Sequence, residues 1–265
     1  GGDEAYTFNI STVSCFVIAA CGMPVAKHGN RSVSSKCGAA DLLEALGAQL
    51  MLSPLENETV LKESGLCFMF AQVYHASMKY AAPVRKELGT RTIFNVLGPL
   101  ANPAAADINL IGVYDKSLVR PIAQVLFNLG VRRGMVVHGL DGLDEISMSD
   151  KTAVCEIDGD TLKSYTLDPR TFGFSFCSRT QLTGGGAVEN AEIAKRVLSG
   201  EKGPKSDIIA LNAAVVLYLA DKCKSIADGI TLAKKALTDG SAYKKMQDFI
   251  RATNRVRGLN VREKL

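Results

Sequence analysis

The sequence contains few of the features that mark membrane-spanning or disulfide-bonded proteins. Its longest apolar stretches, Cys15–Ala26 and Ile208–Ala220, are shorter than the roughly 20 residues needed to span a bilayer. The seven cysteines are widely spaced and form no CxxC pair, which argues against a disulfide scaffold and against a thiolate metal site. These absences favour reduced thiols, a cytoplasmic location and no membrane partner.

An excess of charge of one sign is also missing. The 31 lysines and arginines nearly balance the 27 aspartates and glutamates, so the net charge of +4 is too small to indicate a nucleic-acid partner unless it is concentrated in one place. Hydrophobic residues make up 47% of the chain and charged residues 22%, which excludes disorder and a coiled coil as descriptions of the whole chain. A length of 265 residues predicts one or two domains.

Apolar periodicity in the first third of the chain predicts helices around one short strand. Val13–Ala20 is apolar almost all round, which predicts a buried helix capped within residues 9–12. Met23–Ala26 fits a short buried strand, followed by a polar loop, Lys27–Ser35. A second helix carries Leu42, Leu43 and Leu46, and residues 57–88 are predicted to be mostly helical.

The rest of the chain alternates strands and helices. Strands at Ile108–Tyr114 and Gly134–His138, with a helix at Leu118–Leu129 between them, form the β-α-β pattern of a parallel sheet. A hairpin is predicted within Thr152–Leu167, and helical segments run from Glu189 to Thr253. The predicted fold class is therefore α/β: a central, mostly parallel sheet flanked by helices, with part of a small helical domain.

Two polar segments suit an anionic ligand. Gly1-Gly2-Asp3 precedes Asn9-Ile10-Ser11-Thr12 at a helix start, where glycine N–H groups, the helix N-terminus and hydroxyls favour phosphate or a Mg²⁺ shell. Lys27–Ser35 concentrates two positive charges, an imidazole, an amide and three hydroxyls, with Ser34 and Ser35 at the predicted start of the next helix. The alternatives are a glycine turn with an ordinary cap and a solvated basic loop. The segment Lys27–Ser35 contains no phenylalanine, tyrosine or tryptophan on which bases could stack, which speaks against nucleic-acid binding.

A third segment, His138–Glu145, follows the strand at 134–138 and ends in two adjacent carboxylates. Asp144 and Glu145 suit Mg²⁺, which prefers carboxylate oxygens together with substrate phosphates; the alternative is an exposed acidic turn. A basic, hydroxyl-rich segment and a carboxylate pair in one domain predict a phosphorylated substrate bound with Mg²⁺. No Ser-His-Asp or Cys-His arrangement indicates covalent catalysis.

Several blocks resemble the anthranilate phosphoribosyltransferase family. The segment Lys27–Gly47, KHGNRSVSSKCGAADLLEALG, is similar to the family's signature. Further matching blocks follow the family order at Asn9–Thr12, Val84–Pro103, His138–Ser147 and Glu189–Tyr218. The resemblance implies an enzyme of tryptophan synthesis that transfers the phosphoribosyl group of phosphoribosyl pyrophosphate (PRPP) to the amine of anthranilate, with Mg²⁺ and release of pyrophosphate.

The resemblance also implies roles for individual residues. It implies a pyrophosphate-binding loop of Gly1, Gly2 and Asp3, and PRPP contacts from Asn9, Ser11, Thr12, Lys27 and Ser35. It implies Mg²⁺ ligands at Ser11, Asp144 and Glu145, and anthranilate contacts at His28, Asn30, Arg85 and Gly98. Within that set His28, Asn30 and Arg85 are the expected catalytic residues, with His28 taking up the amine proton. A guanidinium such as that of Arg85 suits a carboxylate because it binds in a bidentate manner.

The sequence departs from the family pattern near its start. The family's glycine loop is longer at the front, and Glu4 stands where the family has glycine. His75-Ala76 stands where relatives often have His-Pro. Family members also carry a helical segment before this loop, so we expect a truncated chain. In that interpretation residues 1–56 and 89–265 form the catalytic domain, residues 57–88 are the remaining part of a small helical domain, and the intact protein is a homodimer.

Two other functions remain open at the level of sequence. A pyrimidine nucleoside phosphorylase would share the fold, but it would carry a different phosphate loop and leave Asp144 and Glu145 without a role. A catalytically impaired family member or fragment would act as a ligand-binding or nucleic-acid-binding module. Nucleic-acid affinity that falls steeply with salt would support the second alternative.

Overall fold

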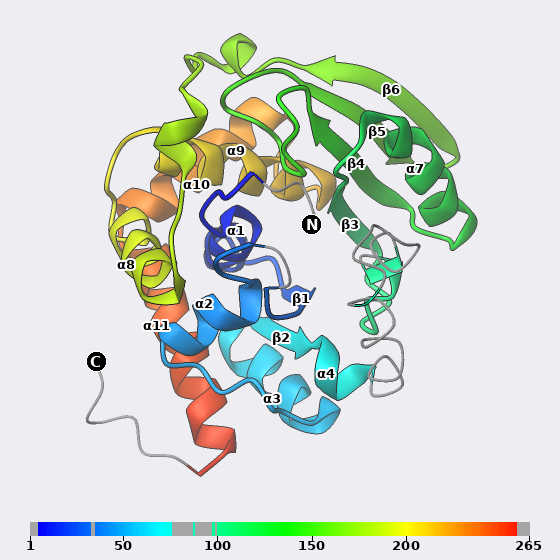
Figure 1. Cartoon of the computed structure of the whole chain (residues 1–265). Coiled ribbons are helices and arrows are strands. Elements are labelled where there is room, and N and C mark those ends of the chain that lie inside the picture. The colour runs from blue at the N-terminus through cyan, green and yellow to red at the C-terminus, as the bar shows by residue number, and fades with distance from the viewer. Residues whose placement is uncertain (1–4, 33–34, 76–86, 88–96, 99, 259–265) are drawn as a thin grey trace.

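The computed structural model describes residues 5–32, 35–75, 87, 97–98 and 100–258 (Figure 1). Helix α1 (Ile10–Ala20) lies at the centre of the molecule and packs against α9 (Pro204–Leu219) and α11 (Ser241–Val256). Its sequence is apolar almost all round, and nine of its 11 residues are buried, so the predicted buried helix is confirmed.

The C-terminal quarter consists of four helices. Helix α8 (Ala187–Leu198) and α10 (Ile226–Thr238) complete the set with α9 and α11. The predicted helical segments are confirmed, and the chain also breaks at Gly240, which adopts φ of 80° before α11 begins. Such a left-handed conformation favours glycine because it has no Cβ. These helices surround α1 and bury it (Figure 1).

The larger sheet has four strands in the order β3-β4-β5-β6, with bounds Ile108–Gly112, Arg133–Gly139, Thr152–Asp158 and Thr161–Leu167. Strands β3 and β4 are parallel and are joined through η2 (Lys116–Leu118) and α7 (Val119–Asn128), which confirms the predicted β-α-β unit. The predicted hairpin is also confirmed, because β5 and β6 pair in antiparallel fashion. Short 3-10 turns η3 (Pro169–Phe172) and η4 (Arg179–Leu182) follow.

Alternate residues of β4 enter two different cores. Met135 and Val137 join the main core, whereas Val136 packs in a second cluster with residues of α7. A period of two is expected of a strand covered on both faces. The four-stranded sheet thus separates α7 from the helical part of the molecule.

A second, two-stranded sheet pairs β1 (Val25–Gly29) with β2 (Leu66–Phe70) in parallel register. Two predictions for this region are wrong. The strand β1 runs on through Gly29, so Lys27 and His28 belong to a half-buried strand and not to a loop. The segment Leu66–Phe70 is a strand and not a helix, because it pairs in parallel with β1; its five consecutive buried residues, LCFMF, suit a strand that is covered on both faces.

Three helices surround this small sheet. Helix α3 (Pro54–Ser64) begins with a capping box at Ser53 and ends at Gly65 in the left-handed region. Helix α4 (Ala71–Tyr74) is a single turn, and α2 (Ala39–Ala45) is capped by Gly38. The prediction that Ser35 lies at the start of α2 is therefore wrong by three residues.

The α/β class is confirmed, but the expectation of a mostly parallel central sheet is wrong for the described residues: in the four-stranded sheet only β3–β4 is parallel, while β4–β5 and β5–β6 are antiparallel. The separate pair β1–β2 is parallel. No helix in that part of the chain is both long and apolar enough to cross a bilayer. Several sequence predictions lie outside the described residues, namely the glycine loop Gly1–Asp3, Ser34, Arg85, most of the block 84–103 and the helical pattern beyond residue 75.

Candidate functional site

The start of α1 brings a hydroxyl and a positive charge together. Lys27, on β1, donates from Nζ to the Oγ of Ser11 at 3.1 Å, and Ser11 is exposed. The first turn of a helix also presents backbone N–H groups without intrahelical partners, which adds positive potential. The structure therefore unites two residues of separate predicted loops at one anion-binding position.

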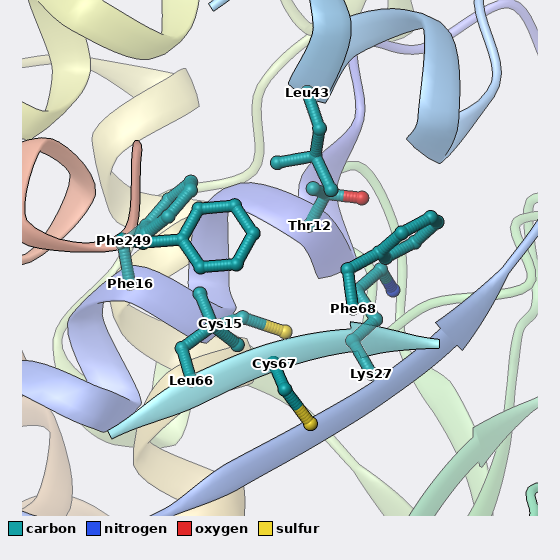
Figure 2. A pocket seen from close by; sticks show the side chains of 9 residues that line it. All are labelled: Thr12, Cys15, Phe16, Lys27, Leu43, Leu66, Cys67, Phe68 and Phe249. Atoms are coloured by element: carbon teal, nitrogen blue, oxygen red, sulfur yellow. The ribbon is translucent and has the colours of Figure 1, made fainter. Parts of the chain in front are cut away.

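Thr12 lies deeper than Ser11. It is 2% exposed, and it lines a small, mainly apolar pocket that Lys27 also borders (Figure 2). The other lining residues are Cys15, Phe16, Leu43, Leu66, Cys67, Phe68 and Phe249. This pocket lies beneath the Ser11–Lys27 contact and belongs to the core that supports it.

The polar segment after β1 is closed at its base by Asp41. The carboxylate of Asp41 accepts hydrogen bonds from the backbone N–H groups of Ser32 at 3.0 Å and Gly38 at 2.8 Å. Burial raises the pKa of Asp41, but these bonds and Arg31 bring it below its usual value. A Cβ on Gly38 would lie 2.3 Å from the Ser32 nitrogen, so only glycine lets the two ends of the segment meet this closely.

Side chains of the same segment are held by the protein. The guanidinium of Arg31 binds both carboxylate oxygens of Glu44, at 2.5 and 2.7 Å, and stacks over the ring of Phe70. Ser35 is exposed, and its Oγ lies 2.9 Å from the Oγ of Ser32. Arg31 thus stabilises the segment, while Lys27 supplies the charge that faces Ser11.

His28 lies beside the backbone of Gly98 and the ring of His75. Its ring forms a hydrogen bond with the backbone of Gly98, and its centroid lies 4.9 Å from that of His75 at an interplanar angle of 79°. The buried Nε2 atoms of both histidines lack a hydrogen-bond partner among the described residues. Burial, reinforced by His75 and Lys27, holds the pKa of His28 below its ordinary value of 6.5 despite the opposing bond to Gly98. The imidazole is therefore neutral at neutral pH.

His75 has no predicted role in the sequence motifs. It follows α4 directly after β2, and β2 runs parallel to the strand that carries His28. Parallel strands end at the same edge, so the pairing of β2 with β1 was the signal that could have found it. Asn30 is exposed, with its Oδ1 accepting from the backbone of Arg31 at 2.8 Å.

The carboxylate pair lies directly over the end of β3. A Cβ on Gly112 would lie only 1.5 Å from the carbonyl oxygen of Asp144, so the close approach requires glycine. From α9, the buried Asn212 accepts from the backbone nitrogen of Ile146 at 3.1 Å and donates to the carbonyl of Ile146 at 2.9 Å. The backbone is thus held on one side of the pair by close packing of Asp144 on Gly112, and on the other by the hydrogen bonds between Asn212 and Ile146.

The third carboxylate of this loop has a structural role. Asp141 accepts hydrogen bonds from the hydroxyls of Ser147, at 2.9 Å, and Ser149, and so closes the turn. At the base of the loop, Nδ1 of His138 lies 2.8 Å from the carbonyl oxygen of Val113. These contacts leave Asp144 and Glu145 as the acidic pair of the loop.

The buried thiol of Cys15 in α1 is influenced by charges on two different segments. The negative charge of Glu145 and the positive charge of Lys27 both act on the buried thiol of Cys15, whose pKa is raised mainly by burial. Cys15 lies one turn after Ser11 and donates to its carbonyl oxygen at 3.1 Å. Cys15 thus ties its own turn of α1 to the turn that carries Ser11.

The donor set is suited to Mg²⁺ held partly by a substrate. Within the described residues no cluster of three or more His, Cys, Asp or Glu side chains could hold a metal ion alone. Two carboxylates and one serine hydroxyl are the kind of groups that bind Mg²⁺ through a few protein oxygens together with substrate phosphates.

The chain is similar in sequence to a family of known enzymes. A family model described as the a/b domain of a glycosyl transferase family matches residues 1–243. Anthranilate phosphoribosyltransferase of Endomicrobium trichonymphae is 56% identical over 254 residues, which are 96% of this chain and 76% of that protein. The enzyme of Methanobrevibacter smithii is 55% identical over the same shares of the two chains.

Solved structures of anthranilate phosphoribosyltransferases have the same fold as this chain. Anthranilate phosphoribosyltransferase from Thermus thermophilus matches with a TM-score of 0.90 and 43% identity over 96% of this chain and 76% of that one. The Saccharomyces cerevisiae enzyme in complex with PRPP and Mg matches with a TM-score of 0.89 and 31% identity, over 98% and 72%. Sequence identity above half and a shared fold over nearly the whole chain show that it belongs to the anthranilate phosphoribosyltransferase family.

Proposed function

We propose that the chain transfers the phosphoribosyl group of PRPP to the amine of anthranilate, giving phosphoribosylanthranilate and pyrophosphate. The observation that carries this proposal is the 3.1 Å contact between Lys27 and Ser11 at the start of α1; the proposed cation ligands Asp144 and Glu145 lie in the loop that follows β4. This arrangement offers positive charge, hydroxyl and carboxylate groups to one phosphorylated ligand and its cation. The activity named for the relatives supports the same substrate pair.

In this proposal the PRPP phosphates bind along the start of α1. Lys27 neutralises phosphate charge, while Ser11 and the first-turn N–H groups donate hydrogen bonds. Asp41 binds the backbone N–H groups of both Ser32 and Gly38. The hydroxyl of Ser35 lies 3.4 Å from the carbonyl oxygen of Cys37, which also accepts from the side chain of Asn9. The full set of proposed PRPP contacts is Gly1, Gly2, Asp3, Asn9, Ser11, Thr12, Lys27 and Ser35.

Asp144, Glu145 and the hydroxyl of Ser11 would hold Mg²⁺. When bound there, Mg²⁺ supplies neutralisation of the charge that develops on the leaving pyrophosphate. The contribution of the chain is to fix the two carboxylates in advance, through Gly112 and Asn212, so that little reorganisation accompanies the reaction.

Anthranilate would bind at the carboxyl edge of β1. Arg85 would hold its carboxylate, and Asn30, Gly98 and His28 would line the rest of its site. The amine nitrogen then forms a bond to C1 of the ribose as the bond from C1 to the pyrophosphate oxygen breaks. The neutral imidazole of His28 accepts the proton released by the amine, which agrees with its lowered pKa. Positioning of both substrates supplies most of the rate enhancement, and no protein nucleophile is needed.

The test is the loss of anthranilate fluorescence when PRPP and Mg²⁺ are added to this chain. We expect the signal to fall only when both are present. A flat signal, with calorimetry detecting no PRPP binding to the folded protein, would overturn the proposal. Phosphorolysis of a pyrimidine nucleoside would support the phosphorylase alternative, and salt-sensitive nucleic-acid binding would support a binding module.

Four further properties are proposed on the strength of the family resemblance. The intact protein acts as a homodimer in the cytoplasm, without nucleic-acid or membrane partners. Light scattering over a tenfold range of concentration tests the dimer, and a constant monomer mass would contradict it. Co-sedimentation with anionic vesicles and with duplex DNA tests the two expected absences.

A further inference from the structure

The buried side-chain amide of Asn190 joins segments that are far apart in the sequence. Asn190 lies in the first turn of α8 and is 1% exposed. Its Oδ1 accepts from the backbone nitrogen of Gly185 at 2.8 Å, and its Nδ2 donates to Oδ1 of Asn9 at 2.9 Å. Asn9 in turn donates from Nδ2 to the carbonyl oxygen of Cys37 at 3.0 Å. Three hydrogen bonds therefore run in series from the 184–186 loop to the end of the polar segment.

The direction of this series is fixed at both ends. The backbone N–H of Gly185 can only donate, and the carbonyl of Cys37 can only accept, so each of the two amides has one permitted orientation. A carboxylate at position 190 could still accept from Gly185, but it could not donate to Asn9. Two acceptor oxygens would then face each other in a partly buried site, which is unfavourable.

The backbone of residues 182–184, which precedes α8, is also hydrogen-bonded to the residues that precede α1. Gly184 donates to the carbonyl of Tyr6 at 3.0 Å, and Phe8 donates to the carbonyl of Leu182 at 3.1 Å. A Cβ on Gly184 would lie 2.6 Å from the Cα of Phe8 and 2.5 Å from Oδ1 of Asn190. The 182–185 segment is therefore a fixed base for the α1 start, and the amide of Asn190 extends this base to Cys37.

Both ends of the series adjoin groups that the proposed function assigns to PRPP. Asn9 caps α1, two residues before the Ser11 hydroxyl that meets Lys27. The carbonyl of Cys37 receives the amide of Asn9 and, at 3.4 Å, the hydroxyl of Ser35. A shift of Asn190 would change the position of Ser11 relative to Ser35, although Asn190 itself reaches neither.

We propose that Asn190 is a positioning residue for PRPP: it sets the relative placement of the α1 start and of the polar segment that ends at Cys37. This inference rests on the proposed function. It differs from a purely stabilising role because it requires a selective effect on one of the two substrates.

The test compares Asn190→Asp with Thr253→Val. Thr253 is likewise fully buried, and its Oγ1 accepts from the backbone nitrogen of Gln49 at 3.1 Å, but it belongs to α11 and to none of the three joined segments. Calorimetry with PRPP and Mg²⁺ is run at a temperature where both variants are folded, together with KM for each substrate and thermal unfolding. Should Asn190→Asp fail to fold, Asn190→Ala, which buries no charge, takes its place.

We expect the Asn190 variant to bind PRPP about tenfold or more weakly, as outer-shell positioning residues do. Its KM for PRPP rises while its KM for anthranilate changes less than about twofold. Thr253→Val lowers the unfolding temperature and leaves PRPP affinity unchanged. Equal affinity in the Asn190 variant and the unsubstituted chain, or an equal loss for both substrates, overturns the inference alone. Absence of PRPP binding by the unsubstituted chain overturns the proposed function as well.

Discussion

The two sides of the candidate site are built in different ways. On the phosphate side, the α1 start and the segment after β1 are held by polar side chains that act over long sequence distances: Lys27, Asp41 and Asn190. On the carboxylate side, the backbone of Asp144 packs closely against Gly112, and one polar side chain, that of Asn212, binds the backbone of the next residue after the pair, Ile146.

This difference has consequences for function. Side-chain hydrogen bonds give the phosphate side an exposed, charged surface that a ligand can complete. Close packing gives the carboxylate side a fixed geometry, because Leu143 and Ile146 on either side of the pair are fully buried. Substitutions on the two sides should therefore have different effects. Changes on the phosphate side should alter the affinity for PRPP, and changes on the carboxylate side should alter the Mg²⁺ requirement.

The largest effect is expected from removal of both carboxylates. Asp144→Asn combined with Glu145→Gln should lower Mg²⁺-dependent turnover about 10³-fold, because the developing charge on the leaving group loses its preorganised counterpart. The measurement is steady-state loss of anthranilate fluorescence over a Mg²⁺ titration. Asp158→Asn with Asp160→Asn, in the β5–β6 turn, removes the same charge and should have no such effect. Unchanged activity in the first variant would refute the metal assignment.

Removal of the positive charge on the phosphate side should have the next largest effect. Lys27→Met is expected to lower kcat/KM for PRPP about 30-fold, the value of one charge-assisted hydrogen bond, with the Mg²⁺ dependence unchanged. Lys36→Met, exposed in the same polar segment, is the matched control and should change little. A shift of the Mg²⁺ requirement without weaker PRPP binding would contradict the assignment of Lys27 to the phosphates.

A single added methyl group on the carboxylate side should act through geometry alone. Gly112→Ala would force the carbonyl of Asp144 away and raise the Mg²⁺ concentration for half-maximal activity about tenfold. Gly134→Ala is the control, since its Cβ would lie 2.9 Å from the carbonyl of Asn109, at the other end of the β3–β4 ladder. That variant should lose stability in thermal unfolding and keep its Mg²⁺ requirement. Equal Mg²⁺ curves for both variants would show that packing at Gly112 does not set the metal site.

The smallest effect at neutral pH concerns His28, which follows Lys27 on β1 and lies beside His75. Because its pKa is lowered from 6.5, the imidazole is neutral at pH 7 and becomes protonated only on acidification. We expect kcat/KM for anthranilate to be flat near neutrality and to fall at a pH below 6.5, by up to about tenfold per unit. His28→Gln should lower kcat/KM for anthranilate at neutral pH and abolish its decrease at acidic pH. If kcat/KM of the variant still decreases at acidic pH as in the unsubstituted chain, His28 is not the proton acceptor.

The sequence predicted those parts of the fold in which local pattern and environment agree. Helix α1 is apolar on every face and is buried on every face. The β3-α7-β4 unit and the β5–β6 hairpin also follow local periods and turn residues. Strand β2 was mistaken for helix because five buried apolar residues in succession fit either structure, and only pairing with β1 decides between them.

The site was predictable as a set of polar segments, and its supports were not. Lys27, Ser11 and Asp144–Glu145 were predicted as site residues because basic and hydroxyl groups suit phosphate, and adjacent carboxylates suit Mg²⁺. Asn190 and Asn212 resemble ordinary helix residues in the sequence, and their partners lie 181 and 66 positions away. Pairings of that length depend on the complete fold, and no local pattern encodes them.

The central claim is that the two differently built sides hold one ligand between them. Its most direct test is a crystal structure of this chain with PRPP and Mn²⁺ in place of Mg²⁺, with anomalous scattering to locate the metal. The account predicts an anomalous peak within coordination distance of Asp144 or Glu145 and of a PRPP phosphate, with Lys27 and Ser11 contacting the same PRPP molecule. PRPP bound elsewhere, or a metal remote from both carboxylates, would contradict it.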